Sequence, residues 1–171
     1  MAALSLDRQI TDLYETVLTF VKTFAQSADA EDIVQEAMMN ALKHKDQYNS
    51  SKGSLPVWVR SIAYHGFLDF KRKKKRRNEI GLSVLLSSEE RIDSEKFHRV
   101  SYDPTIEEPT DHSNLVKLVG ELPSKHRDVV IRGYFLRQPY TDIARVCRIP
   151  LGTVKSRLHA AKQELRLKIA S

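Results

Sequence analysis

The sequence predicts an all-α protein with two small helical domains joined by a flexible acidic linker. Apolar residues recur at three- and four-residue steps on both sides of a polar middle, and the first block contains no convincing strand-like alternation. Charge divides the chain at the same places. Residues 1–77 carry 13 basic and 9 acidic side chains, residues 78–114 carry 3 and 9, and residues 115–171 carry 12 and 4. Two basic blocks therefore flank an acidic middle.

Composition limits the class of protein. The chain has 171 residues and a formal charge of +6, which favours a polyanionic partner. Its single cysteine, Cys147, excludes an internal disulfide and a cysteine-rich zinc site. No stretch approaches the ~20 consecutive apolar residues of a membrane span, and residues 1–11 lack the pattern of a signal peptide. We therefore expect a cytoplasmic protein without a membrane partner.

The first two helices are predicted from apolar periodicity. One is expected from Asp7 to about Ala25, and the next is expected to begin near Asp29, a favourable N-cap residue. The second helix would bury Ile33, Val34, Ala37, Met38, Ala41 and Leu42. Its opposite face would carry Asp32, Gln35, Glu36, Met39, Asn40 and Lys43. This polar face is free for a partner.

A third helix is predicted after the polar loop Asp46 to Gly53, with Ser54 as its cap and Pro56 in its first turn. Its apolar stripe consists of Trp58, Val59, Ile62, Ala63, Phe67 and Phe70. Its remaining surface carries Arg60, Tyr64, His65, Asp69 and Lys71. Rings among cations are typical of surfaces that bind unstacked single-stranded bases, although Trp58 and Phe67 also suit the core.

The third helix leads into seven consecutive cations, Lys71 to Arg77. This run is compatible with nucleic-acid binding, with a solvated helix end and with a nuclear-import patch. The acidic middle that follows contains turn-prone Asp103-Pro104 and Glu108-Pro109, so we interpret it as a linker. Its short apolar run Ile80 to Leu86 is a candidate for an ordered piece that docks elsewhere.

The second block is predicted to end in a helix-turn-helix. A helix from Pro123 is ended by Gln138-Pro139, and Thr141 then caps a short helix. The inward residues of this short helix are expected to be Ile143, Ala144, Val146 and Cys147. After the turn Arg148 to Pro150, the last helix runs to about Ile169 and buries Val154, Leu158, Ala161 and Leu165. Its other side presents groove-reading side chains, namely Lys155, Ser156, His159, Lys162 and Gln163.

The sequence predicts no cofactor and no metal site. The six histidines show no metal-ligand spacing, and the chain has no phosphate-binding glycine loop and no nucleophile elbow. An enzyme whose catalytic residues come from distant positions remains open.

Three stretches of the sequence resemble motifs of one known protein family. They are Asp29-Ala-Glu-Asp-Ile-Val-Gln-Glu36, Val57-Trp-Val-Arg-Ser-Ile-Ala-Tyr64, and Leu122-Pro-Ser-Lys-His-Arg127 through Asp142-Ile-Ala144 to Pro150-Leu-Gly-Thr-Val-Lys-Ser-Arg-Leu158. Together they resemble bacterial RNA polymerase sigma factors of the extracytoplasmic-function type (ECF; group IV of the sigma-70 family), over nearly the whole chain. The resemblance implies a sigma-2 domain at 1–77, a linker at 78–112 and a sigma-4 domain at 113–171.

The resemblance also implies partners and contact residues for a non-enzymatic initiation factor. Core RNA polymerase would be bound through its beta-prime clamp helices and beta flap, with the clamp contact at Asp32, Gln35, Glu36 and Asn40. The minus-10 element would be melted and held by Asn49, Ser50, Lys52, Trp58, Arg60, Tyr64, His65, Lys71, Arg72 and Lys74. The minus-35 element would be read by Lys155, Ser156, Arg157, His159 and Lys162. An anti-sigma factor is a further expected partner.

Two positions depart from the family pattern. Arg148 occupies a turn position usually held by glycine, so it requires an uncommon backbone conformation or a different turn. Ala160 occupies a position that is often arginine. A free-standing helix-turn-helix regulator that binds duplex DNA as a dimer is the alternative, and a nucleic-acid-processing enzyme is a third hypothesis.

Overall fold

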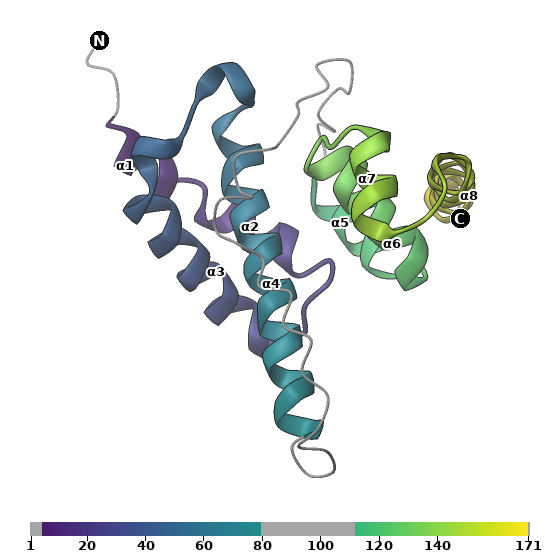
Figure 1. Ribbon diagram of the computed structural model, residues 1–171, viewed down its shortest axis with the longest axis horizontal. Coiled ribbons are helices and arrows are strands. Elements are labelled where there is room, and N and C mark those ends of the chain that lie inside the picture. The colour runs from purple at the N-terminus through teal and green to yellow at the C-terminus, as the bar shows by residue number, and fades with distance from the viewer. Residues whose placement is uncertain (1–4, 80–111, 171) are drawn as a thin grey trace.

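The computed structural model describes residues 5–79 and 112–170, and all regular elements within these ranges are helices. They form two units that lie side by side, α1 to α4 and α5 to α8 (Figure 1). The all-α prediction is confirmed. The apolar run Ile80 to Leu86 and most of the predicted linker lie outside the described residues.

The first predicted helix is wrong in one respect, because the chain forms two helices there, α1 (Leu6–Thr11) and α2 (Tyr14–Val21). Between them the amide of Leu13 bonds to the carbonyl of Ile10 at 3.0 Å, three residues back instead of four. This tightened turn leaves both Ile10 and Val17 fully buried. The apolar periodicity was therefore correct, but it does not reveal the interruption.

Helix α3 spans Ser27–Lys43 with Gln26 at the N-cap, so the predicted cap at Asp29 is wrong. Asp29 lies in the first turn, where its carboxylate accepts from Lys74 at 3.0 Å. The predicted inward residues are buried, apart from half-buried Leu42, and the predicted polar face is exposed throughout. The helix therefore has the two faces that its sequence indicates.

Helix α4 spans Leu55–Glu79 and follows two short 3₁₀ turns, Lys45–Gln47 and Ser50–Lys52. Ser54 precedes it, and its carbonyl accepts from the amide of Trp58 at 3.1 Å. The predicted side-chain cap is wrong, because the buried Ser54 hydroxyl has no hydrogen-bond partner among the described residues. Trp58 and Phe67 are half-buried and pack against the core.

The C-terminal unit contains α5 (His112–Gly120), α6 (Ser124–Val130), α7 (Tyr140–Cys147) and α8 (Leu151–Ala170). A π-helical turn, Ile131–Phe135, continues α6. Helix α7 begins at Tyr140 with Pro139 at the N-cap, so Thr141 is not the cap. The prediction that Val146 faces inwards is wrong: it is 52% exposed and lies at the cleft between the units instead of in the core of its own unit.

The turn between α7 and α8 is made by a residue that rarely suits it. Arg148 adopts the left-handed conformation, with φ 53° and ψ 45°. The next amide, that of Ile149, bonds back to the carbonyl of Ala144 at 3.0 Å, which closes the helix end as a glycine turn would. Of the two possibilities for Arg148, the uncommon backbone conformation is the one adopted.

Buried apolar residues form one cluster that extends through both units. Phe20 of α2 and Phe135 of the π-helical turn meet across the junction, with ring centroids 5.4 Å apart. Arg60 and Tyr64, predicted for the free surface of α4, are only 5% and 1% exposed. That part of the surface prediction is wrong because the C-terminal unit packs against these residues. Among the described residues, no helix is long and apolar enough to cross a bilayer.

Candidate nucleic-acid interface

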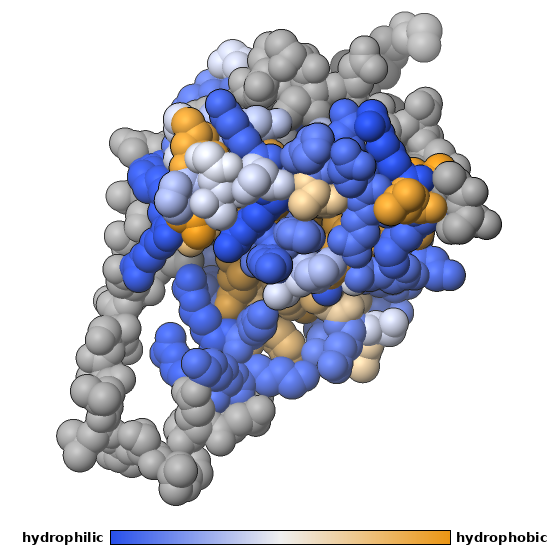
Figure 2. All heavy atoms as spheres, turned by 90° about the vertical axis from the view of Figure 1, so that its right-hand side faces the viewer, coloured by the Kyte–Doolittle hydropathy of each residue, from blue (hydrophilic) through white to orange (hydrophobic). Residues whose placement is uncertain are grey.

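Helix α8 presents most of its predicted minus-35 residues to solvent. Val154, Leu158 and Ala161 are buried, which turns Lys155, Ser156, His159 and Lys162 outwards. The side of the molecule on which α8 lies is predominantly hydrophilic (Figure 2). This face is therefore cationic and belongs to a helix that follows a tight turn. Helices that read the major groove of DNA have the same two features.

Within the predicted minus-35 set, only Arg157 is half-buried. It lines a cleft of about 350 Å³ between the units, together with Lys125 and Arg132 of the C-terminal unit and Tyr64 and Leu68 of α4. The other four members share the outer face of α8. The structure therefore separates Arg157 from the rest of the predicted reading set.

The loop residues of the predicted minus-10 set are exposed and locally ordered. Asn49 Oδ1 accepts from the amide of Ser51 at 2.9 Å and from its hydroxyl at 2.7 Å, which caps the 3₁₀ turn. Ser50 and Lys52 of this turn are exposed. The ring of Trp58 lies 5.5 Å from that of Tyr48, so the loop packs onto the start of α4.

The cations at the far end of α4 form an exposed patch. Lys71, Arg72 and Lys74 are exposed, and two of them make ion pairs on the surface. Arg72 donates to Asp69 at 3.1 Å, and Lys74 donates to Asp29 at 3.0 Å. Exposed pairs of this kind are worth little, ~0–1 kcal/mol, so these cations can exchange their partners for phosphates at small cost.

The middle of α4 is covered, unlike the exposed loop before the helix and the exposed cations at its far end. Tyr64 packs against both Phe24 and Phe67, and the guanidinium carbon of Arg132 lies 5.1 Å from the centroid of its ring. Burial raises the pKa of Tyr64 to about 12, although the Arg132 charge opposes this shift. The phenol therefore stays neutral at physiological pH.

His65 is the neighbouring member of the predicted minus-10 set. Its Nδ1 lies 2.7 Å from the carbonyl oxygen of Ser61. Burial lowers its pKa below the usual 6.5, the bond to Ser61 opposes this, and the charge of Arg132 lowers the pKa further. His65 is therefore neutral at pH 7 in the folded chain.

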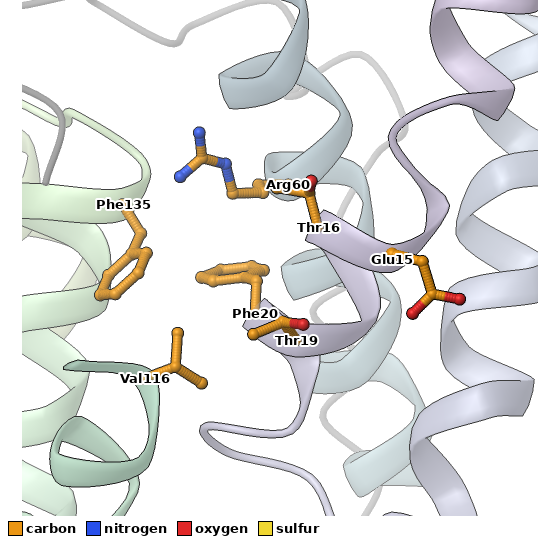
Figure 3. A pocket seen from close by; sticks show the side chains of 7 residues that line it. All are labelled: Glu15, Thr16, Thr19, Phe20, Arg60, Val116 and Phe135. Atoms are coloured by element: carbon orange, nitrogen blue, oxygen red, sulfur yellow. The ribbon is translucent and has the colours of Figure 1, made fainter. Parts of the chain in front are cut away.

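A second cleft, of about 220 Å³, lies between α2, α4 and the C-terminal unit. Figure 3 shows Phe20 and Phe135 facing each other, with Val116 below them and Arg60 above. The Nε of Arg60 donates to the carbonyl of Pro56 at 3.2 Å. Both Arg60 and Tyr64 thus face the C-terminal unit.

Sequence reasoning missed Arg132. Its side chain is 6% exposed, its Nη1 donates to Gln138 Oε1 at 3.3 Å, and its buried Nε has no hydrogen-bond partner among the described residues. A signal was present, because Arg132 follows the apolar run Val129 to Ile131. A cation at a core-facing position indicates a contact beyond its own helix.

The polar face of α3 is a separate exposed surface. It carries the predicted polymerase-contact residues Asp32, Gln35, Glu36 and Asn40, with Met39 between them at 71% exposure. In the part of the chain that the structure describes, no group of three or more His, Cys, Asp or Glu residues is placed to hold a metal ion.

Comparison with known proteins agrees with this arrangement. Residues 10–77 match the model of sigma-70 region 2, and residues 112–165 match that of sigma-70 region 4. The ECF RNA polymerase sigma factor SigL of Mycobacterium tuberculosis is 27% identical over 168 residues, 97% of this chain and 90% of that protein. SigW of Bacillus subtilis, another ECF sigma factor, is 28% identical over 143 residues, 81% of this chain and 74% of that protein.

The fold is also found in a solved structure. The sigma factor RpoE of Bartonella quintana, crystallised with the anti-sigma factor NepR, aligns with a TM-score of 0.59 and 21% identity over 98% of both chains. A free-standing regulator with one helix-turn-helix would not account for the region 2 match. With both regions present, in order and along helices of the expected kind, the chain belongs to the extracytoplasmic-function group of sigma-70 RNA polymerase sigma factors.

Proposed function

We propose that three separate surfaces of this sigma factor divide the work of promoter recognition. The exposed face of α8, with Lys155, Ser156, His159 and Lys162, would read the minus-35 element in the major groove. Arg157 belongs to this set once it leaves the cleft. The observation that carries the proposal is the cationic, solvent-exposed face of α8 behind an ordered turn.

The minus-10 element would be melted and held by α4 and the loop before it. Asn49, Ser50 and Lys52 lie at the loop, Trp58 and His65 on the helix, and Lys71, Arg72 and Lys74 at its basic end. Extruding a base costs a few kcal/mol, which stacking on rings and contacts with cations would offset. Arg60 and Tyr64 belong to the same proposed set, but they become accessible only when the C-terminal unit moves away.

The exposed α3 face with Asp32, Gln35, Glu36 and Asn40 would bind the beta-prime clamp helices of core polymerase, and the C-terminal unit would bind the beta flap. The proposed factor catalyses no reaction itself. An anti-sigma partner is part of the proposal, supported by the similar fold of a sigma factor solved with NepR. It would cover the polymerase-binding surfaces of both units. The domain limits 1–77 and 113–171 remain those inferred from the sequence.

Run-off transcription with core polymerase tests this function on DNA of unselected sequence. Sheared genomic DNA of the source bacterium serves as the template, and transcript 5′ ends are mapped with and without the protein. We expect new start sites that require both core enzyme and the protein. Tight duplex binding by the protein alone, with no core-dependent start sites, would contradict the proposal.

A charge reversal on α3 provides the specific control. Glu36→Lys should reduce core binding by about tenfold or more, because it places a cation on the surface proposed to dock on polymerase. Asp12→Lys reverses an exposed acid in the turn between α1 and α2 and should leave core binding unchanged. Equal loss in both variants would assign the effect to net charge and remove α3 from the interface.

A further inference from the structure

We propose that the larger cleft between α4 and the C-terminal unit binds a small phosphorylated molecule, of the size and kind of a mononucleotide. The proposed promoter function does not require such a ligand, so the two can be tested separately. The cleft has a volume of about 350 Å³, at the lower end of the range for small-molecule sites. Its walls come from α4 and from the C-terminal unit, which lie side by side in Figure 1.

Positive charge dominates this cleft. Three cations line it, Lys125 of α6, Arg132 of the π-helical turn and Arg157 of α8, against one carboxylate, Asp128. Asp128 lies three residues after Lys125 and four before Arg132, a spacing at which helical side chains can pair. Within residues 5–79 and 112–170, however, none of the three cations makes an ion pair with a carboxylate. They are therefore available to an anionic ligand.

Arg132 is the most buried of these cations. Its side chain is 6% exposed, and its Nη1 donates to Gln138 Oε1 at 3.3 Å. Its buried Nε has no hydrogen-bond partner among the described residues. Buried polar atoms of native proteins almost always have a partner, and a buried cation without a counter-charge is unfavourable. A phosphate in the cleft would supply the missing negative charge.

The ionisable groups beside Arg132 do not supply that charge. Burial raises the pKa of Tyr64 to about 12 and also raises the pKa of the Cys147 thiol, although the charge of Arg132 opposes both shifts. Both groups are therefore neutral at pH 7. The guanidinium of Arg132 thus contacts neutral groups, among them the ring of Tyr64 and the side-chain oxygen of Gln138.

The lining residues also indicate the chemistry of the ligand. Guanidinium and ammonium groups bind phosphate through charge-assisted hydrogen bonds, and arginine often makes two in parallel. Beside the cations, Leu68, Val129 and Val146 provide an apolar wall. Asp128 would repel further anionic groups, but with Ser124 it can accept hydrogen bonds from hydroxyl or amino groups. A molecule with phosphate at one end and a sugar or ring at the other fits this set, as a nucleotide does.

Promoter DNA is another source of phosphate, because Arg157 belongs to the proposed minus-35 set. A duplex could reach Lys125, which is exposed. It could not reach Arg132, which is 6% exposed and lies between the units in a cleft of small-molecule size. The observations therefore favour a small molecule over DNA at this site.

Binding of N-methylanthraniloyl-ATP to the full chain, followed by fluorescence anisotropy in EDTA, tests the site. We expect saturable binding with one site per chain. Unlabelled ATP and inorganic pyrophosphate should each displace the probe. A DNA duplex of random sequence, at the same phosphate concentration, should displace it less effectively than pyrophosphate does.

Charge removal in the cleft provides the matched comparison. Arg132→Gln and Arg157→Gln should each weaken binding by about tenfold or more, because each removes a charged contact with phosphate. Lys125→Gln, at an exposed position, should weaken it by about threefold. Arg166→Gln is the control, since Arg166 is an exposed arginine of α8 outside the cleft lining and its loss should leave binding unchanged. Circular dichroism reports folding, and if Arg132→Gln fails to fold, Arg157→Gln decides.

Three results would overturn the proposal. The first is the absence of saturable binding by wild type. The second is an equal loss in Arg157→Gln and Arg166→Gln, which would indicate attraction by diffuse positive charge. The third is displacement by duplex DNA that is as effective as displacement by pyrophosphate. Failure of the proposed promoter function is distinguishable, because core-dependent start sites are measured without the nucleotide probe.

Discussion

Helices α4 and α8 are both basic and both predicted to face DNA, yet the chain presents them differently. The outer face of α8 is exposed because its buried stripe packs within its own unit. The middle of α4 is covered because the other unit packs on it, with Arg132 against Tyr64. A helix face is therefore free or occupied according to its tertiary neighbours, even where two sequences have similar amphipathic patterns.

The two helix faces should differ most in how much a substitution on each lowers the free energy of unfolding of the protein. Tyr64→Ala removes a ring that is 1% exposed and in contact with Phe24, Phe67 and Arg132, and should cost ~3–5 kcal/mol in the free energy of unfolding. Lys155→Ala, at an exposed position on α8, should change it by ~0.5 kcal/mol or less. Urea unfolding followed by circular dichroism measures both values.

Tyr64→Phe is the matched control for this comparison. It keeps the ring and its packing and removes only the hydroxyl, so its cost should be well below that of Tyr64→Ala. Similar small losses for Tyr64→Ala and Lys155→Ala would mean that the middle of α4 is solvated, and the contrast between the helices would disappear.

The second difference concerns duplex DNA. Lys155→Ala should weaken binding of holoenzyme to a promoter several-fold and reduce the slope of log affinity against log salt by about 1, because one phosphate contact is removed. Core binding should not change. Lys168 lies on the same helix, but its ammonium is 2.7 Å from the carboxylate of Glu121, which makes Lys168→Ala a matched control. Fluorescence anisotropy on a promoter located by run-off mapping, at several salt concentrations, measures the slopes.

A loss of core binding in Lys155→Ala would contradict the assignment of α8. Equal changes in salt slope for Lys155→Ala and Lys168→Ala would indicate that the helix contributes only diffuse positive charge. In either case α8 would not be a helix that recognises the minus-35 sequence, and the difference between it and the basic end of α4 would disappear.

The sequence was sufficient to predict which residues of a helix are buried where that helix packs within its own unit. The two faces of α3 and the buried stripe of α8 follow from residue spacing, since these helices bury their apolar sides locally. The resemblance of three motifs identified the family. The uncommon conformation of Arg148 was also foreseen as one of two possibilities, because the position suits glycine.

The failures have two physical origins. The observed N-caps, Gln26 and Pro139, lie three and two residues before the predicted caps, Asp29 and Thr141. Neither makes a side-chain capping bond, so capping chemistry does not set these two helix starts. Burial of Arg60, Tyr64 and Arg132 depends on docking between the units, because all three line the clefts between them. Periodicity along one helix contains no information on a contact with residues more than 60 positions away in the sequence. It therefore could not predict this junction.

The smallest expected effect is a pH dependence that originates in the covered part of α4. Burial lowers the pKa of His65 below 6.5 in the folded chain, so the unfolded chain binds protons more readily. The contribution of neutral His65 to the free energy of unfolding is therefore fully present above pH ~6.5. It is lost as the pH falls through this value towards the pKa of the folded chain. Between about pH 7.5 and 5.5 the melting temperature of wild type should fall more than that of His65→Gln, as thermal unfolding would measure.

This pH effect also distinguishes a covered α4 from an open one. The charge of Arg132, on the C-terminal unit, is one cause of the lowered pKa, alongside burial. A Cβ atom on Gly120 would lie 3.3 Å from the backbone carbonyl oxygen of Thr23 in the other unit, so Gly120→Gln should separate the units. This variant is therefore expected to bring the pKa of His65 closer to 6.5 and to reduce the pH dependence. Nuclear magnetic resonance titration of the His65 ring in both chains measures the pKa directly. An unchanged His65 pKa in an open Gly120→Gln chain would show that the N-terminal unit alone buries this ring, and the influence of the C-terminal unit would then be confined to Arg60 and Tyr64.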